Sequence, residues 1–278
     1  MRLATCELRD GTVTVGAREG DDVFATGADS MRSVIADGDQ AIEAIVKEVA
    51  RHRRLDVGRV LAPLADSGKM LFCGLNYRGH AEENPDAVFP EEPFFFSKVP
   101  SAVIGDGQAI ALPAPDAQTD WEVELAVVIG RTARDVPADQ AMDHVFGYTV
   151  VNDVSARAIQ FKDQQITLGK NPDTFCPMGP EIVLASELGD PTQLGLRSFV
   201  NGEVMQDAST SDMVFSIPTL VEFLTTLMTL HPGDIVSTGT PAGVGTFRSP
   251  PRYLEPGDDV VVEVDGIGRI TNPVVARW

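Results

Sequence analysis

Residues 119–130 read TDWEVELAVVIG, and residues 146–157 read FGYTVVNDVSAR. In the first segment Glu122 and Glu124 alternate with apolar residues and lead into a β-branched run, a pattern that predicts a strand. The second segment is another β-rich run, and a carboxylate, Asp153, follows it. Side chains two positions apart in a strand point to the same face, so we expect both glutamates on one side of a largely apolar strand.

Three carboxylates among apolar neighbours suggest a metal site. They repel one another unless a cation lies between them, because taking unpaired charge out of water is costly. Ligation by oxygen alone suits Mg²⁺, Mn²⁺ or Ca²⁺ better than Zn²⁺. Alternating acids are also typical of an exposed edge strand with a solvated face. The spacing alone favours that second interpretation, and the motifs described below shift the balance.

The composition indicates a globular protein that is not built to bind polyanions. Hydrophobic residues make up 43% and charged residues 23% of the 278 residues, enough for one large domain with or without a small one. The 41 acidic residues against 22 basic ones give a formal net charge of −19. This excess argues against nucleic acid or an anionic membrane as a partner. An anionic substrate would need a metal ion or a few basic residues to bind.

The cysteines and the N-terminus point to a reducing, cytoplasmic setting. Cys6, Cys73 and Cys176 are far apart and odd in number, and no C-x-x-C motif occurs. Neither a disulfide framework nor a zinc ribbon is therefore expected. The first ten residues lack an apolar signal core, and no apolar run approaches the roughly 18 residues of a membrane span.

Residues 1–65 are predicted to form a small β-rich N-terminal domain with one helix and no recognisable chemical motif. Short apolar runs separated by turn residues predict strands at 3–8, 12–15, 23–26 and 57–64. Apolar residues at helical spacing predict a helix over 39–52.

Residues 66–278 are predicted to form a second, larger domain. A short helix after the apolar strand 70–76 would place His80 and Glu83 on one face, at positions i and i+3. The segment 84–93 is rich in proline and acids, which predicts a surface loop or lid.

The C-terminal half is predicted to be mostly strands separated by turns. One amphipathic helix is expected over 217–227, with Ser216 as its N-cap. The glycine-rich loop 239–245 matches neither a P-loop nor a dinucleotide-binding motif. The whole chain is therefore expected to be mainly β with a few helices, in the α+β class.

Several motifs, in this order, resemble those of the fumarylacetoacetate hydrolase family, in its acylpyruvase and 2-hydroxyhepta-2,4-diene-1,7-dioate isomerase branch. They are Gly74-Leu75-Asn76-Tyr77 with His80, Phe96-Ser97-Lys98, Asp120-Trp121-Glu122-Val123-Glu124-Leu125, Asn152-Asp153-Val154-Ser155-Ala156-Arg157 with Gln160, Gly169-Lys170, Asn201-Gly202-Glu203, and the loop from Ser237 to Gly245. Each motif alone is weak, but their joint order over residues 70–276 is specific.

The resemblance implies that residues 66–278, after the small N-terminal domain, form a catalytic domain with a mixed β-sandwich roll, usually in a homodimer. It also implies that Glu122, Glu124 and Asp153 hold a divalent metal, Mg²⁺ or alternatively Mn²⁺ or Ca²⁺. Members of the family cleave C–C bonds in acylpyruvates, decarboxylate oxaloacetate, or isomerise and hydrate related 2-oxo acids.

The reaction expected first is metal-dependent hydrolysis of acylpyruvate-type 2,4-dioxo acids to pyruvate and a carboxylic acid. The substrate would chelate the metal, which stabilises the enolate left by cleavage. His80 is predicted to act as general base on a water, with Glu83 orienting its ring. The structural alternative for His80 is an exposed helix histidine bonded to a neighbouring acid.

Other site residues are predicted with structural alternatives beside them. Lys170 would stabilise an oxyanion or the far end of the substrate, or it is a solvated loop lysine. Thr240, in the glycine-rich loop, would help to bind the substrate carboxylate, or it belongs to an ordinary turn. Arg157 and Gln160 either contact substrate or support the metal ligands.

Two other activities use the same metal chelate and stay open as alternatives. One is oxaloacetate decarboxylation, and the other is isomerisation or hydration of a 2-hydroxy-diene-dioate from aromatic catabolism. The His80–Glu83 pair favours activation of water but could equally move a proton within the substrate. A catalytically silent metal-binding protein is a more remote alternative. Zinc-peptidase and serine-hydrolase motifs are absent from the sequence.

Overall fold

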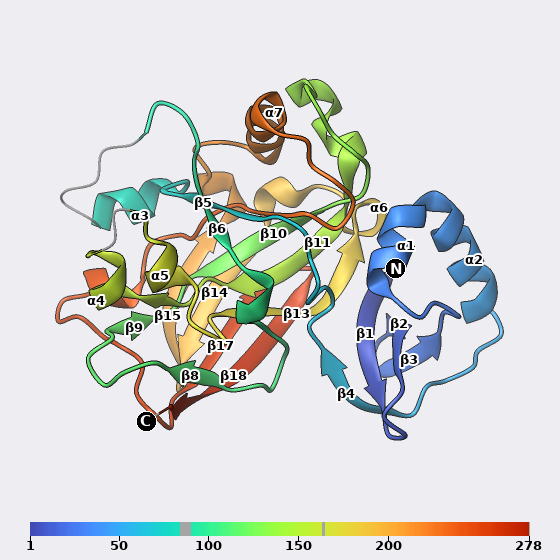
Figure 1. The fold of residues 1–278 in the computed structure, drawn as a ribbon, viewed down its shortest axis with the longest axis horizontal. Coiled ribbons are helices and arrows are strands. Elements are labelled where there is room, and N and C mark those ends of the chain that lie inside the picture. The colour runs from blue at the N-terminus through green and yellow to red at the C-terminus, as the bar shows by residue number, and fades with distance from the viewer. Residues whose placement is uncertain (84–89, 163–164, 278) are drawn as a thin grey trace.

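The computed structural model describes residues 1–83, 90–162 and 165–277. In these ranges the chain forms two large β-sheets that pack on each other, with helices around them (Figure 1). This confirms the mainly β, mixed sandwich fold that the sequence predicts.

The larger sheet has eleven strands. Its main path is, in order, β3 (Asp22–Ala25), β2 (Val13–Glu19), β1 (Arg2–Leu8), β13 (Cys176–Leu184), β11 (Val145–Asn152), β10 (Val123–Ile129), β16 (Ile235–Ser237), β5 (Met70–Gly74) and β6 (Phe94–Lys98). Off this path, β4 (Val57–Leu61) pairs with β1, and β7 (Val103–Ile104) pairs with β13. Most pairs are antiparallel, but β5 runs parallel to β16 and β7 runs parallel to β13.

The second sheet has five strands and covers one face of the first. Its order is β15 (Glu203–Ser209), β14 (Gly195–Val200), β17 (Asp259–Val264), β18 (Gly268–Ala276) and β8 (Ile110–Leu112). A separate short pair joins β9 (Thr119–Asp120) and β12 (Ser155–Ala156). Asn201 and Gly202 both have positive φ angles, 53° and 81°, in the hairpin between β14 and β15, as an Asn-Gly turn allows.

The helices are short and lie at the ends and edges of the sheets. They are α1 (Met31–Asp37), α2 (Asp39–Val49), α3 (Arg78–Glu83), α4 (Arg157–Gln160), α5 (Thr167–Lys170), α6 (Ala185–Leu188) and α7 (Ile217–Leu227). Figure 1 shows α1 and α2 with β1–β3 at one end of the molecule, and α3, α4 and α5 gathered near the opposite end. Single 3₁₀ turns occur at Pro100–Ala102, Pro191–Gln193, Thr210–Asp212 and Gly245–Phe247, and a longer one at Ala138–His144.

The central strands are buried on both faces. Every residue of β10 and of β13 is buried, which explains why the segment from Leu125 to Ile129 reads as a continuous apolar run. One core cluster joins β10 and β11 to residues of β17 and β18, such as Val262 and Ile270, and to the inner face of α7. The site described below lies at the ends of strands held in this rigid core.

Several local expectations can be compared with the observed elements. Helix α7 has the predicted bounds, and the Ser216 hydroxyl accepts a hydrogen bond from the backbone N–H of Thr219. Helix α2 begins where predicted and ends three residues early, at Val49. Helix α1 was not predicted; its seven residues give fewer than two clear turns of apolar periodicity, and only Met31, Val34 and Ile35 are buried.

Two expectations about the chain's organisation stay predictions. Strand β1 pairs with β13, so the N-terminal strands continue the large sheet, and nothing tests the division into two domains at residue 65. The predicted loop or lid over 84–93 lies mostly outside the described residues. In the described part of the chain no helix is long and apolar enough to cross a membrane.

Candidate active site

Strand pairing brings the three predicted metal ligands together. Glu122 directly precedes β10, Glu124 lies within it, and Asp153 directly follows β11. Strands β10 and β11 are neighbours, and their pairing places Asp153 opposite Glu122. The backbone N–H of Asp153 donates to the carbonyl of Glu122 at 2.9 Å. One carboxylate oxygen from each of the three residues lies within 4.8 Å of the other two, and all three side chains are buried.

Two buried lysines neutralise part of this acidic cluster. The Lys170 ammonium donates to Glu122 Oε2 at 2.9 Å and to Asp153 Oδ2 at 2.6 Å. Lys98 donates to the other carboxylate oxygen of Asp153 and to the carbonyl of Lys170. The Asp153 and Glu122 carboxylates raise the pKa of Lys170 against the opposing effect of burial. Lys170 is therefore a charged member of the cluster and not a solvated loop lysine.

Arg157 binds the acidic cluster from its other side. Its guanidinium donates to Asp120 Oδ1 at 2.7 Å, to Glu122 and to Gln160 Oε1 at 3.1 Å. Burial raises the pKa of the Asp120 carboxyl to about 6, although Arg157 opposes that shift. Burial would also raise the pKa of Glu122, but Lys170 and Arg157 outweigh it and hold that pKa below its usual range. These contacts favour a supporting position for Arg157 behind the predicted ligands.

Glu124 is the acid of the cluster that lacks a cationic partner among the described residues. Its Oε2 atom accepts hydrogen bonds from the Ser237 hydroxyl and from the backbone N–H of Gly239. Burial, with the neighbouring charges of Asp153 and Glu122, raises its pKa well above the usual value. The environment of Glu124 thus disfavours an isolated negative charge.

The residues of the cluster fit a divalent cation. Four buried carboxylates, from Asp120, Glu122, Glu124 and Asp153, face only three buried cationic side chains among the described residues. In the described part of the chain, Glu124 is the carboxylate without a cationic partner, and it lies beside the carboxylates of Glu122 and Asp153. Three carboxylate oxygens are a donor set that Mg²⁺ and Mn²⁺ prefer. We therefore find that the triad could hold such an ion.

His80 and Glu83 form a hydrogen-bonded pair on α3. His80 Nδ1 lies 2.7 Å from Glu83 Oε1, and Glu83 Oε2 accepts from the backbone N–H of Gly243 at 2.7 Å. Gly243 has φ +104°, and a Cβ there would lie 2.1 Å from the carbonyl oxygen of Met205, so this close approach requires glycine. The glycine-rich loop thereby fixes the pair.

A cavity of about 210 Å³ joins these groups. Seven of the nine predicted site residues line it, namely His80, Glu122, Glu124, Arg157, Gln160, Lys170 and Thr240. The other two, Glu83 and Asp153, support it through their bonds to His80 and Lys170. The structure thus gathers the nine residues at one place, while their individual roles stay predictions.

Thr240 lies at the cavity, but its hydroxyl is occupied. It donates to the carbonyl of Val123 at 2.9 Å and accepts from Gln206 Nε2 at 2.8 Å. Its predicted contact with a substrate carboxylate would have to compete with these bonds.

Gln206 is a site residue that the sequence analysis missed. It is 1% exposed and uses its whole amide: Oε1 accepts from the Val123 N–H and the Ser198 hydroxyl, and Nε2 donates to Thr240 and to the Pro241 carbonyl. Val123 lies between two of the predicted metal ligands. No spacing pattern predicts this residue, because its bonds to Val123 and to the loop at Thr240 and Pro241 join segments that are distant in sequence.

The three cysteines are buried and free. Burial raises the pKa of Cys6 to about 11 and that of Cys176 to about 12, and it raises the pKa of Cys73, which lines the cavity, further still. These thiols are therefore protonated near neutral pH, as expected for inert cysteines.

Comparisons with known proteins identify similar sequences and similar structures in one protein family. A family model described as "Fumarylacetoacetate (FAA) hydrolase C-terminal" matches residues 69–275. The Xenopus laevis protein named "Oxaloacetate tautomerase fahd2, mitochondrial" is 45% identical over 218 residues, which cover 78% of this chain and 68% of that protein. The structure of 5-carboxymethyl-2-hydroxymuconate delta-isomerase from Mycobacterium smegmatis is 39% identical, with a TM-score of 0.80 and complete coverage of both chains. Maleylpyruvate hydrolase from Sphingobium sp. SYK-6, solved with manganese(II) and pyruvate, is 31% identical, with a TM-score of 0.84 over both whole chains.

Proposed function

This chain belongs to the fumarylacetoacetate hydrolase family, and we propose that it is a metal-dependent enzyme that interconverts the keto and enol forms of 2-oxo acids. The similarity to an oxaloacetate tautomerase supports the isomerase-type alternative more than the acylpyruvate hydrolysis that the sequence analysis placed first. Oxaloacetate is accordingly the first substrate to test.

The hydrogen-bonded pair of His80 and Glu83, at the same cavity as the acidic triad, is the observation that carries the proposal. A carboxylate only accepts hydrogen bonds, so the imidazole donates through Nδ1, and the neutral ring carries its lone pair on Nε2. Glu83 also stabilises the ring once it is protonated. A base of this kind is what a reaction that only moves a proton requires.

Glu122, Glu124 and Asp153 are the residues that would hold a divalent ion. Mg²⁺ or Mn²⁺ bound there would supply Lewis-acid polarisation of a 2-oxo carboxylate. Manganese is the first ion to test, because a hydrolase relative was solved with manganese and pyruvate.

The side chains can complete the proton transfer in two steps. Nε2 of His80 accepts a proton from C3 of the keto form, and the negative charge moves to the 2-oxygen. The buried ammonium of Lys170 offsets that charge. The His80 imidazolium then returns the proton to the oxygen, which gives the enol with no net gain or loss of protons.

The first experiment follows the decay of enol-oxaloacetate absorbance with Mn²⁺, with Mg²⁺ and with EDTA. We expect acceleration that EDTA removes, and His80→Gln to lower kcat by about 10²–10⁴-fold, the usual contribution of a general base. His231→Gln is the matched control, because His231 is exposed and does not line the cavity. Acceleration that survives both EDTA and His80→Gln would refute the proposal.

Acylpyruvate hydrolysis is the second candidate, favoured by the whole-chain similarity to maleylpyruvate hydrolase. The same His80 could deprotonate a water that attacks C4 of a 2,4-dioxo acid. Pyruvate release from acetylpyruvate or fumarylpyruvate separates this reaction from tautomerisation. Pyruvate release from oxaloacetate would instead indicate decarboxylation.

A further inference from the structure

The cavity at the acidic triad is lined by buried charged side chains at its inner end, its floor, and by exposed aromatic side chains at its outer end, its mouth. The most deeply buried charged residues of its lining, each 1–5% exposed, are Glu122, Glu124, Arg157 and Lys170. By contrast Phe94 and Phe161, which also line the cavity, are 46% and 63% exposed. A ligand that fills the cavity thus meets charge at its inner end and aromatic surface at its outer end.

Aromatic rings continue from the mouth toward the predicted base. The rings of Phe94 and Phe96 have centroids 6.4 Å apart, and the ring of Phe247 lies 6.0 Å from that of His80. Leu75 and Ile166 add half-buried aliphatic surface to the same lining. Large exposed apolar side chains that line one cavity are typical of a ligand contact, because a ligand that buries their apolar surface lowers the free energy.

The cationic side chains of the lining are already paired at the floor. Arg157 and Lys170 are the Lys and Arg residues among the described lining, and both bind buried carboxylates. The residues outside the described ranges include no Lys or Arg either. A second carboxylate at the outer end of a substrate would therefore meet no unpaired cation from the described lining.

We propose that the mouth formed by Phe94 and Phe161, together with the ring of Phe247 on the same lining, binds an apolar group at the far end of the substrate. The enzyme then prefers 2-oxo acids with an aryl or branched alkyl substituent over 2-oxo diacids such as oxaloacetate. This inference rests on the proposed function for the chemistry of the 2-oxo acid end, and it narrows the substrate class.

Two probes that cannot enolise isolate the binding step. Oxamate and N-phenyloxamate share the 2-oxo acid end and differ by one phenyl group, and calorimetry on the full chain with Mn²⁺ gives both Kd values. We expect N-phenyloxamate to bind about tenfold more tightly, the gain from burying part of an aromatic ring. The kcat/KM for tautomerisation should likewise be about tenfold higher for phenylpyruvate than for oxaloacetate, a difference of about 1.4 kcal/mol.

Phe161→Ala tests the mouth directly. We expect this variant to bring the ratio of the two Kd values close to one. Leu227→Ala is the matched control, because Leu227 is equally exposed at 63%, lies at the end of α7 and does not line the cavity. It should keep the tenfold ratio.

The outcomes separate this inference from the proposed function. Equal Kd values in the unaltered protein, an unchanged ratio in Phe161→Ala, or no binding of either probe with Mn²⁺ would each overturn the inference, even if oxaloacetate is tautomerised. A tenfold ratio that depends on Phe161 would support it, even if the oxaloacetate assay fails.

Discussion

Glu124 differs from the other acids of the site in its partners. Glu122 and Asp153 each bind at least one cationic side chain, whereas the described partners of Glu124 are a hydroxyl and a backbone N–H. A buried carboxylate in that position gains most from a metal ion, since the ion supplies the charge that the protein does not. At the residue scale, Glu124 is therefore the sharpest test of metal binding.

We expect Mn²⁺ to stabilise the unaltered protein but not Glu124→Gln. An ion that binds only the folded state adds about 2.7 kcal/mol at 100 times its Kd, and the amide would weaken or remove this binding. Thermal unfolding with Mn²⁺ and with EDTA measures the effect, and Glu203→Gln, at an exposed position of β15, is the control. If Mn²⁺ raises the Tm of Glu124→Gln as much as that of the unaltered protein, Glu124 is not a ligand.

Gln206 shows how the two sheets jointly position the site. It projects from β15 of the five-stranded sheet, and its amide reaches Val123 at the start of β10 and the glycine-rich loop at Thr240 and Pro241. The same loop holds Glu83 through the N–H of Gly243. At the scale of elements, one side chain thus joins the strand of the predicted metal ligands to the loop that holds the His80–Glu83 pair.

Replacing Gln206 should therefore lower metal affinity as well as stability. Gln206→Leu leaves buried partners unsatisfied, at a cost of about 1–3 kcal/mol each, and removes the bond that holds Val123 between the predicted ligands Glu122 and Glu124. We expect lower stability in urea together with a Kd for Mn²⁺ raised about tenfold or more, about 1.4 kcal/mol.

Asn272→Leu is the matched control for Gln206→Leu. Asn272 is also 1% exposed in a strand, and its amide binds the carbonyls of Gly105 and Gln108, away from the site. It should lower stability while Mn²⁺ affinity stays the same. Equal Mn²⁺ affinities in both variants would reduce Gln206 to a purely structural residue.

The sequence predicts those parts of the site that depend on local spacing. His80 and Glu83 are three residues apart on a helix, and Glu122 and Glu124 are two apart at a strand, so their mutual positions follow from helix and strand geometry. Asp153 is expected beside them because it follows the second β-rich run, and the family resemblance implies the same three ligands. The residues that neutralise these acids cannot be predicted in this way, because the pairing of strands from distant segments decides which residues lie beside them.

Lys98 and Gln206 illustrate this limit. Lys98 is 55 residues from Asp153 in sequence, and Gln206 is 83 residues from Val123. Nothing within one segment indicates either contact. The same reason explains why the pairing of β1 with β13, between Leu3 and Ile182, was not predicted although a strand was expected at 3–8.

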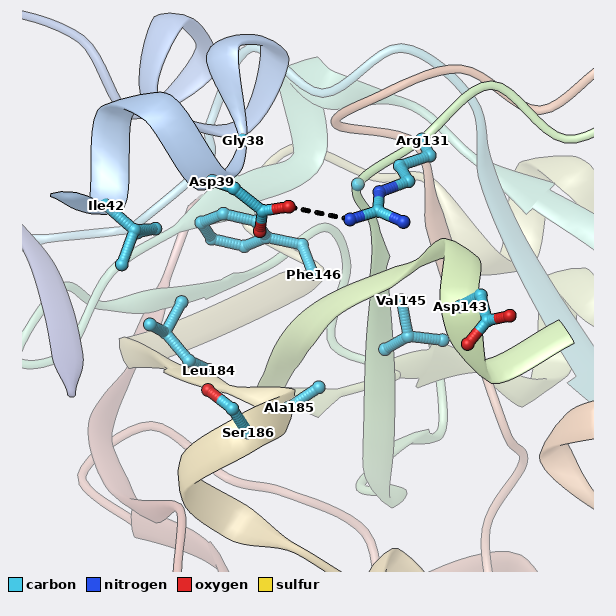
Figure 2. A pocket seen from close by; sticks show the side chains of 11 residues that line it. Gly38, Asp39, Ile42, Arg131, Asp143, Val145, Phe146, Leu184, Ala185 and Ser186 are labelled. Carbon is cyan, nitrogen blue, oxygen red and sulfur yellow. Dashed lines mark hydrogen bonds and ion pairs between the residues drawn. The ribbon is translucent and has the colours of Figure 1, made fainter. Parts of the chain in front are cut away.

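At the scale of the whole molecule, the N-terminal region is joined to the rest by the β1–β13 pairing and by packing beneath α2. A cavity of about 170 Å³ marks this junction, and Figure 2 shows Ile42 of α2, Phe146 of β11 and Leu184 of β13 around it. Asp39 and Arg131 form an ion pair at its edge, at 2.8 Å. The homodimer expected from the family stays a prediction.

The ion pair should contribute less to the free energy of unfolding than the apolar contacts at this junction do. The Asp39 and Arg131 side chains are 86% and 62% exposed, and exposed pairs of this kind contribute about 0–1 kcal/mol. Phe146 is half-buried and packs against the core cluster that contains Leu184 and the inner face of α1. We expect Arg131→Ala to lower the free energy of unfolding by less than about 1 kcal/mol.

Phe146→Ala should cost more, about 2–3 kcal/mol, somewhat below the range for a fully buried phenylalanine. Because the sheet is continuous from β3 to β6, both variants should still unfold in urea in one transition, the same by fluorescence and by circular dichroism. Two separate transitions in Phe146→Ala would instead mean that residues 1–65 unfold on their own. That result would support the domain boundary predicted from the sequence and would show that strand pairing alone does not couple the two parts.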